Sequence, residues 1–192
     1  INANQPTAVS IASTLGGSVC LGSGQNIALT GTPAGGTFSG TGISGNTFVT
    51  TGLSPGFYSI TYTYVNANGC TSTTQTTLVI RPSVVASANP ITSTICSGQS
   101  VTLIANTGAG LSYQWLLNGN PISGANQGSY TATAGGTYTV EVTSGGCSAI
   151  SNNAIVSIDV PPSLSVSGNL TICRGTSTTL TVSGADTYLW TP

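Results

Sequence analysis

The chain has 192 residues, of which only 3% are charged, and it contains five cysteines, no histidine and no methionine. Its two arginines, Arg81 and Arg174, cannot neutralise a phosphate backbone, which excludes nucleic acid as an expected partner. No segment is long and apolar enough to predict a membrane-spanning helix, so the chain is not expected to be membrane-embedded. Short alternating apolar runs are frequent, so the sequence can form a hydrophobic core and does not have the composition of a disordered chain.

Similar segments recur along the chain at a nearly constant spacing. Cys20, Cys96 and Cys173 are each followed two positions later by Gly and then by a β-type run, and they stand 76 and 77 positions apart. Cys70 and Cys147 each follow a Gly and are also 77 positions apart. Self-similarity at a fixed period predicts a repeat architecture.

The period divides the chain into units. Residues 1–4 are expected to end a preceding unit or to form a linker. The predicted units are a first repeat at 5–80, a second at 81–160 and a third at 161–192, which the given sequence truncates.

In the first repeat, residues 57–64 alternate with a period of two and predict a strand. Tyr58 and Ile60 lie on its inward face. Tyr62 and Tyr64 share that face but are expected to be more open, because the strand is long enough to extend beyond the core.

The second repeat shows the clearest pattern of strands. They are predicted at 83–88, 100–106, 111–117, 129–133, 137–143 and 154–160. Tyr113 and Trp115 share one face of the third strand, and Tyr138 faces inward on the fifth. Short alternating strands, glycine-rich turns and the lack of helical periodicity predict an all-β fold of sandwich units. The third repeat begins the same pattern, since its 188–190 segment matches 113–115.

The pairing of cysteines that follows the repeat joins Cys20 to Cys70 and Cys96 to Cys147, and leaves Cys173 unpaired in this sequence. Four cysteines allow three pairings, so the period favours this one without proving it. Buried free thiols are the alternative. A disulfide that closes a loop of about 50 residues should stabilise a unit by ~4 kcal/mol. Disulfides persist in oxidising compartments, so an extracellular location at the cell surface is expected.

The order of motifs is Cys, a Val/Leu strand, Tyr-x-Trp, Gly-x-Tyr-Thr-Val and Gly-Cys. It resembles the immunoglobulin-like and polycystic-kidney-disease-like repeats of giant Bacteroidota surface proteins, which include gliding adhesins exported by type IX secretion. The resemblance covers nearly all of the chain and implies tandem immunoglobulin-like β-sandwiches with Trp115 and Trp190 in the core. The aromatic residues expected in the cores are Phe38, Tyr58, Tyr113, Trp115, Tyr138, Tyr188 and Trp190. The cysteines fall near strand ends rather than strand centres, so a disulfide is expected to clamp an end or edge of the sandwich.

The sequence offers little for catalysis. General acid–base chemistry needs titratable groups placed together, and the only carboxylate side chains are Glu141, Asp159 and Asp186. A Ser or Cys nucleophile would lack a histidine base. No loop has two carboxylates for calcium, and the cysteines are too scattered for zinc. We therefore expect no catalytic residue, metal ligand or cofactor, and no enzyme activity.

The uncharged surface suggests a structural function. Monomeric β-proteins usually protect sheet edges with charges, above all lysine, and this chain has no lysine and a net charge of −1. Copies of the chain are therefore expected to pack side by side into a homo-oligomeric fibre or bundle, as part of an extracellular filament or adhesin stalk; a flexible monomeric stalk is the alternative. A different function would be a module that binds a glycan or cell-surface ligand. Such a module should expose a cluster of aromatic side chains, whereas a spacer should bury them.

Overall fold

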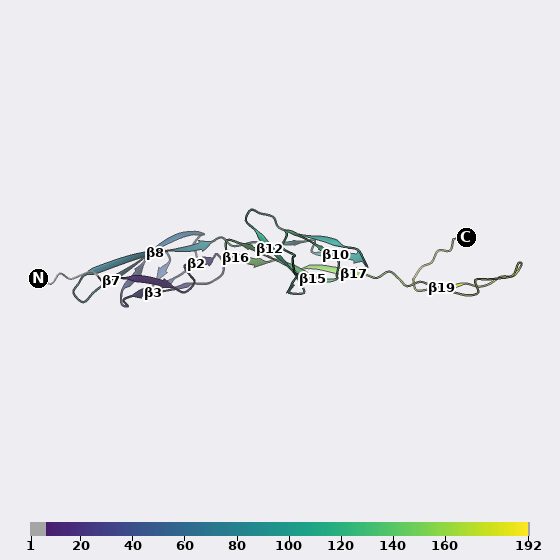
Figure 1. Ribbon diagram of the computed structural model, residues 1–192, viewed down its shortest axis with the longest axis horizontal. Helices are drawn as coiled ribbons and strands as arrows, with labels where there is room; N and C mark the ends of the chain where they lie inside the picture. Colours follow the sequence, from purple (N-terminus) through teal and green to yellow (C-terminus); the bar gives the residue numbers. More distant parts are fainter. Residues whose placement is uncertain (1–6, 192) are drawn as a thin grey trace.

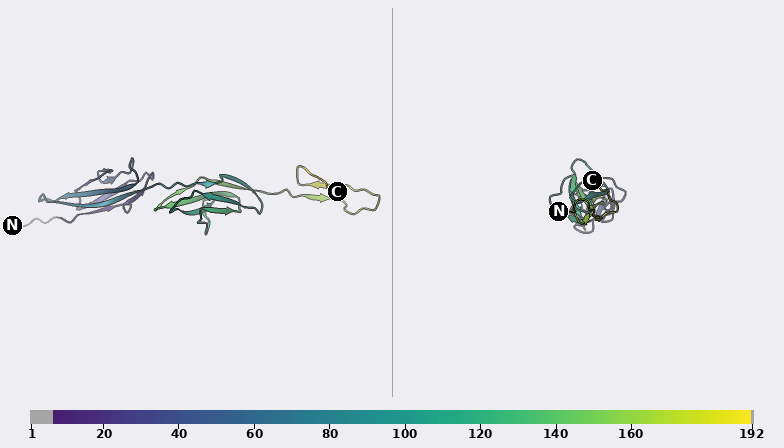
Figure 2. Two further views of the ribbon diagram at one scale, coloured as in Figure 1. Left: turned by 90° about the horizontal axis from the view of Figure 1, so that it is seen from above. Right: turned by 90° about the vertical axis from the view of Figure 1, so that its right-hand side faces the viewer.

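The computed structural model describes residues 7–191, and every regular element among them is a β-strand. Two β-sandwiches and a β-hairpin follow one another along the long axis (Figure 1). The perpendicular views show the same arrangement as a slender rod (Figure 2). The predicted linker at 1–4 lies outside the described residues.

The first sandwich consists of two four-stranded sheets with the orders β1-β3-β6-β5 and β2-β8-β7-β4. The strands are β1 Ser10–Ser13, β2 Ser18–Cys20, β3 Ile27–Thr32, β4 Thr37–Ser39, β5 Ile43–Ser44, β6 Thr47–Phe48, β7 Gly56–Val65 and β8 Thr71–Arg81. Strand β2 runs parallel to β8 and ends with Cys20 opposite Arg81. The long β7–β8 hairpin forms the centre of its sheet.

Strand β7 buries the inward side of its alternating pattern. Ile60 and Tyr62 are 0% and 1% exposed, so the expectation that Tyr62 would be open is wrong. Its ring fits because Gly31 and Gly36 have no side chains on the facing surface. The Tyr62 hydroxyl donates a hydrogen bond to the carbonyl of Pro33 and accepts one from the Gly36 N–H at 2.9 Å. These two bonds satisfy the polar end of a ring that is otherwise buried.

Gly31→Ala is expected to lower the stability of the first sandwich by about 1–3 kcal/mol, because overpacking forces neighbouring groups to shift. A Cβ at position 31 would lie 2.1 Å from Cζ of Tyr62. Gly56→Ala is the matched control, since Gly56 is also a strand glycine but its Cβ would meet nothing within 4 Å. Urea unfolding followed by circular dichroism measures both variants. Equal losses from the two would contradict the packing of Tyr62 over Gly31.

The second sandwich repeats this plan. One sheet has the order β10-β17-β15-β12-β13, with β16 also paired to β15, and the other has the order β14-β11-β9. The strands are β9 Ala88–Asn89, β10 Thr92–Cys96, β11 Val101–Ala105, β12 Ser112–Leu117, β13 Asn120–Pro121, β14 Ser129–Ala132, β15 Gly136–Ser144, β16 Cys147–Ile150 and β17 Ala154–Asp159. Strand β10 runs parallel to β17 and ends with Cys96 opposite Asp159.

Aromatic residues form the centre of the hydrophobic core of the second sandwich. Trp115 and Tyr138 are 0% and 1% exposed, and Tyr113 is half-buried against the same cluster. Nε1 of Trp115 donates a hydrogen bond to the carbonyl of Gln127 at 2.9 Å. The ring of Tyr130 packs against both buried rings, with centroid distances of 6.2 Å to Trp115 and 5.8 Å to Tyr138. The indole is thus both packed and hydrogen-bonded.

Stability of the second sandwich should fall in alkaline solution. Burial raises the pKa of the Tyr138 hydroxyl above its ordinary value of 10.0, and the neighbouring Tyr130 acts in the same direction. Because its pKa is higher in the folded state than in the unfolded state, the folded state favours the neutral phenol. The contribution of Tyr138 to the free energy of unfolding is therefore complete below pH 10.0 and is lost as pH rises through the pKa of the folded state. Urea unfolding measured across this range should show a decline that Tyr138→Phe reduces. An identical decline in that variant would contradict the assignment to Tyr138.

The other aromatic residues predicted for the cores divide into two groups. In the first sandwich, Phe38 is half-buried with its ring centroid 4.7 Å from that of Tyr62, and Tyr58 is half-buried against Phe48. In the third unit, Tyr188 and Trp190 are 42% and 55% exposed, so their predicted core positions are wrong.

The described part of the third unit explains that exposure. It contains one antiparallel hairpin, β18 Ser165–Ser167 with β19 Thr181–Ser183. A two-stranded hairpin presents its apolar face without a second sheet to cover it. The side chains of Tyr188 and Trp190 therefore lie open beside the hairpin.

Candidate functional site: the joint between the two sandwiches

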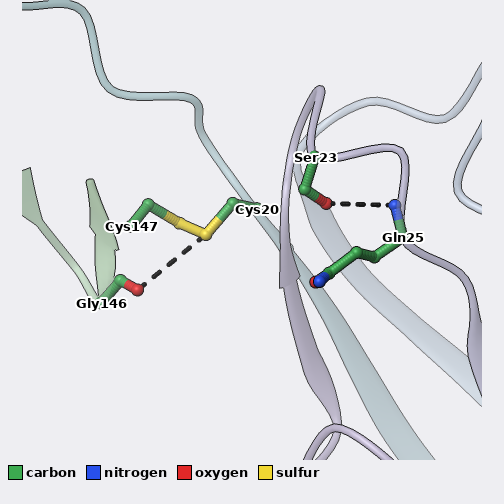
Figure 3. The surroundings of a disulfide bond; sticks show 5 residues. All are labelled: Cys20, Ser23, Gln25, Gly146 and Cys147. Atoms are coloured by element: carbon green, nitrogen blue, oxygen red, sulfur yellow. Dashed lines mark hydrogen bonds between the residues drawn. A yellow bond between two sulfur atoms is a disulfide. The ribbon is translucent and has the colours of Figure 1, made fainter. Parts of the chain in front are cut away.

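A disulfide bond connects the two sandwiches. Cys20 and Cys147 lie 127 positions apart in sequence, with 5.8 Å between their Cα atoms, within the ordinary range for a disulfide. Cys20 is the last residue of β2 in the first sandwich, and Cys147 is the first residue of β16 in the second. Figure 3 shows the bond spanning the gap between the two units. It is therefore a covalent link across the joint rather than a bond within either core.

The predicted pairing within each unit is wrong, because Cys70 and Cys96 are free thiols. In the first sandwich the reason is the length of β8. Cys20 lies opposite Arg81, the last residue of that strand, whereas Cys70 immediately precedes its first residue. Eleven residues of strand span roughly 35 Å. A disulfide requires Cα atoms within about 7 Å of each other, so these two cysteines cannot meet.

The same geometry separates the second predicted pair. Cys96 lies opposite Asp159 at the end of β17. Cys147 pairs with Ser144 at the β15–β16 turn, at the other end of the sheet. Each sandwich therefore carries one cysteine at each of its ends.

Backbone hydrogen bonds fix the position of Cys20. The parallel pairing of β2 with β8 continues into a bond from the Leu21 N–H to the carbonyl of Arg81 at 2.8 Å. The chain then turns away through a bond from the Ser23 N–H to the carbonyl of Cys20 at 3.2 Å. Gly22 allows this turn because its φ is +79°. The sulfur of Cys20 is thereby held at the end of the first sandwich that faces the second.

A tight hairpin turn presents Cys147 to that sulfur. Gly145 and Gly146 occupy the two central positions of the β15–β16 turn with φ values of +57° and +84°. Two positive φ angles are the requirement of a type I′ turn, which glycine meets without strain. Sγ of Cys20 lies 3.9 Å from the Gly146 carbonyl oxygen. An oxidised sulfur has no proton to donate, so this approach is a packing contact.

The backbone forms the second connection at the joint. It leaves β8 at Arg81 and passes through Pro82, whose ring fixes φ. Two residues later Val84 packs against the core of the second sandwich. The side chain of Asn106 then holds this segment, since its amide donates to the Val85 carbonyl at 3.0 Å. The connection is therefore short and fastened to the second sandwich.

A hollow lies beside the segment that connects the two sandwiches. Arg81 at the end of β8 and Pro82 of the connecting segment line it together with Leu111, Ser144 and Gly145 of the second sandwich. The chemistry that the structure shows at this joint is the Cys20–Cys147 crosslink.

Other candidate chemistry is dispersed over the molecule. Within residues 7–191, no three side chains of His, Cys, Asp or Glu come together as a metal site. Glu141 is half-buried on β15, and Asp159 ends β17. Cys173 is a free, exposed thiol. The same residues include no helix with the length and apolarity needed to cross a membrane.

Comparison with known proteins finds similarity to solved structures at low sequence identity. No family profile and no curated protein sequence matches the chain. Among solved structures, the chain is similar to murine CEACAM1b, with 17% identity, 79% of this chain and 100% of that chain covered, and a TM-score of 0.43. For the titin I-band fragment I67–I69 the identity is 12%, the coverage is 88% of this chain and 73% of that chain, and the TM-score is 0.41.

The structure of the N-terminal four Ig domains of Dscam1 isoform 7.44 is 18% identical, with 59% of this chain and 30% of that chain covered and a TM-score of 0.37.

The strand order provides the argument for the fold. In the first sandwich, β1-β3-β6-β5 faces a sheet in which β8, β7 and β4 are neighbours, which is the ABED and GFC arrangement of the immunoglobulin fold. The chain is all-β and is built of tandem immunoglobulin-like β-sandwich repeats.

Proposed function

We propose that the chain is a structural segment of an extracellular filament or adhesin stalk, with units at 5–80, 81–160 and 161–192 joined end to end. The observation that supports this function best is the Cys20–Cys147 disulfide across the joint. A second covalent link beside the backbone holds neighbouring units together, which suits a spacer under tension. The burial of Trp115, Tyr138 and Tyr62 also fits a spacer.

The disulfide supports a location outside the cell. Disulfides persist where thiols are not kept reduced, as in secreted and surface-exposed proteins. The motif order that resembles the repeats of giant Bacteroidota adhesins, exported by type IX secretion, agrees with such a location. We place the segment at the cell surface on these two grounds.

The disulfide also limits how far the chain can be stretched. A force applied to the two ends passes from Cys20 directly to Cys147, so the residues between them carry no tension. At roughly 3.4 Å per residue, these residues would otherwise add roughly 400 Å to the unfolded length. Even after both sandwiches unfold, the oxidised chain stays short by that amount.

Single-molecule force spectroscopy on the whole chain tests this function. The unfolded, oxidised chain should extend without the residues that the disulfide encloses. The unfolded C20S/C147S chain should be longer by the extended length of those residues. C70S/C96S is the matched control, because both of its altered cysteines are free in this chain. A C20S/C147S chain that releases no more length than the oxidised parent would contradict the proposal.

Copies of the chain pack side by side in this proposal. The net charge of −1 leaves little electrostatic repulsion between copies. Large apolar side chains such as Ile104 on β11 and Ile150 on β16 are 52% and 57% exposed. Sedimentation velocity over a range of concentrations should show concentration-dependent association. A monomer at every concentration would remove lateral packing from the proposal and leave the stalk function in place.

A glycan-binding module receives less support. Its expected sign is a cluster of exposed aromatic side chains, and Tyr188 and Trp190 are exposed beside the third-unit hairpin. Their exposure accompanies the lack of a second sheet among the described residues of that unit. It therefore does not favour a ligand site.

A further inference from the structure

Cys96 occupies the same position in the second sandwich that Cys20 occupies in the first. Each is the last residue of a strand that runs parallel to the final strand of its unit, opposite the end of that strand. The residue after each cysteine donates its N–H to the carbonyl of the opposite residue, at 2.8 Å for Leu21 and 3.0 Å for Ser97. Cys20, which forms the disulfide, and Cys96, which is a free thiol, therefore have the same strand pairing and the same backbone hydrogen bond after them.

The turn that follows these cysteines is also shared. The residue three positions on donates its N–H to the cysteine carbonyl, at 3.2 Å for Cys20, 2.9 Å for Cys96 and 3.1 Å for Cys173. We call these three residues the trailing cysteines, because in the two sandwiches they lie at the end of the unit that faces the next one.

Cys70 corresponds in the same way to Cys147. Each follows a glycine in the left-handed region, with φ of +77° at Gly69 and +84° at Gly146. Cys147 is the first residue of β16 and Cys70 immediately precedes β8, so each lies at a hairpin turn at the end of its unit that faces the preceding one. We call Cys70 and Cys147 the leading cysteines.

The two free thiols of the sandwiches lie at the outer ends of the two-sandwich body. Cys96 is exposed and Cys70 is half-buried. Neither can reach the other cysteine of its own unit, because a whole strand length separates them. The one disulfide among residues 7–191 joins a trailing cysteine to the leading cysteine of the next unit.

We infer that Cys96 and Cys70 are the two halves of further joints of the same kind, and that their partner is another unit of this repeat. Cys96 pairs with the leading cysteine of a unit that follows, and Cys70 pairs with the trailing cysteine of a unit that precedes. In each pairing two thiols lose two protons and two electrons to form one S–S bond. A disulfide oxidant, such as glutathione disulfide, accepts them and is reduced to two thiols.

This pairing rule gives a staggered series in which every disulfide crosses a joint and none lies within a unit. It rests on the equivalent positions of the cysteines and not on the proposed mechanical function. A failure of either proposal can therefore be recognised separately.

A chain with one more second unit tests the rule. Residues 1–159 are followed directly by residues 82–192, so that Asp159 takes the place that Arg81 has at the first joint. The test version keeps only Cys96 of the original unit and Cys147 of the added unit, with Ser at every other cysteine. In a buffer of reduced and oxidised glutathione, both thiols should be lost to alkylation and recovered after reduction, as read by intact mass.

Two further versions of the same extended chain serve as controls. The matched control keeps Cys96 and Cys147 of one unit and should retain both thiols. The reference keeps Cys20 and the original Cys147 and should form the observed bond, which shows that the extended chain folds.

The proposal is overturned if the test version stays reduced while the reference oxidises, or if the matched control oxidises. A reference that stays reduced also overturns it, because the joint from which the rule is drawn would then be lost. Peptide mapping of the test version, in which each remaining cysteine occurs in one copy alone, should find Cys96 of the original unit linked to Cys147 of the added unit.

Discussion

Replacing both Cys20 and Cys147 by Ser is expected to lower the free energy of unfolding of the second sandwich by about 4 kcal/mol. If that sandwich unfolds while the first stays folded, its chain remains held at Arg81 and at Cys147. These two points close a loop of about 65 residues, which restricts the unfolded state as a disulfide within the unit would. Urea unfolding of the oxidised parent and the variant measures the difference.

The single variants Cys70→Ser and Cys96→Ser are the controls for this experiment. Both residues are free thiols near the chain surface, so each change should stay within about 0.5 kcal/mol. A loss of several kcal/mol from Cys70→Ser would instead indicate that Cys20 pairs within its own unit, and would contradict the observed joint.

Trp115→Ala is expected to destabilise the second sandwich by about 3–5 kcal/mol, the usual cost of removing a buried aromatic side chain. The indole is 0% exposed and packs against Tyr130. The variant also leaves the carbonyl of Gln127 without the 2.9 Å hydrogen bond from Nε1. Circular dichroism during urea unfolding is the suitable measurement, because the change removes one of the two tryptophans that fluorescence would follow.

Trp190→Ala is the matched control within the same chain. Trp190 is 55% exposed beside the third-unit hairpin, so its removal should change stability by no more than about 0.5 kcal/mol. If the two alanine variants lost equal stability, Trp190 would have to be packed in a core, which contradicts its exposure in this structure.

Alternation in the sequence predicted central strands of one sheet in each sandwich. The 57–64 and 137–143 patterns lie within β7 and β15, and the Trp115 segment lies within β12. Alternation could not show that β2 and β10 pair in parallel with the final strands. These segments are short, and their pairing depends on residues that are distant in sequence.

The cysteine period could not decide between pairings. A bond within each unit and a bond between neighbouring units both recur with the period of 76 or 77 positions, so the period suggested the first without excluding the second. What decides is the end of the sandwich at which each cysteine lies. That position follows from the direction of the strands: β8 carries the chain from Cys70 at one end to the neighbour of Cys20 at the other. The direction and length of the strands, rather than the spacing of the cysteines, were the missing information.

Two attachments at one joint change the freedoms that the rod retains. A single backbone linker would let one sandwich swivel about the long axis, but the Arg81–Val84 segment and the Cys20–Cys147 bond together block that torsion. Bending remains only about the line through the two attachments. The two sandwiches therefore keep one fixed rotation relative to each other about the long axis. If every joint has the same two attachments, that rotation repeats from unit to unit, and a face that recurs in each unit follows a path of regular pitch along the rod.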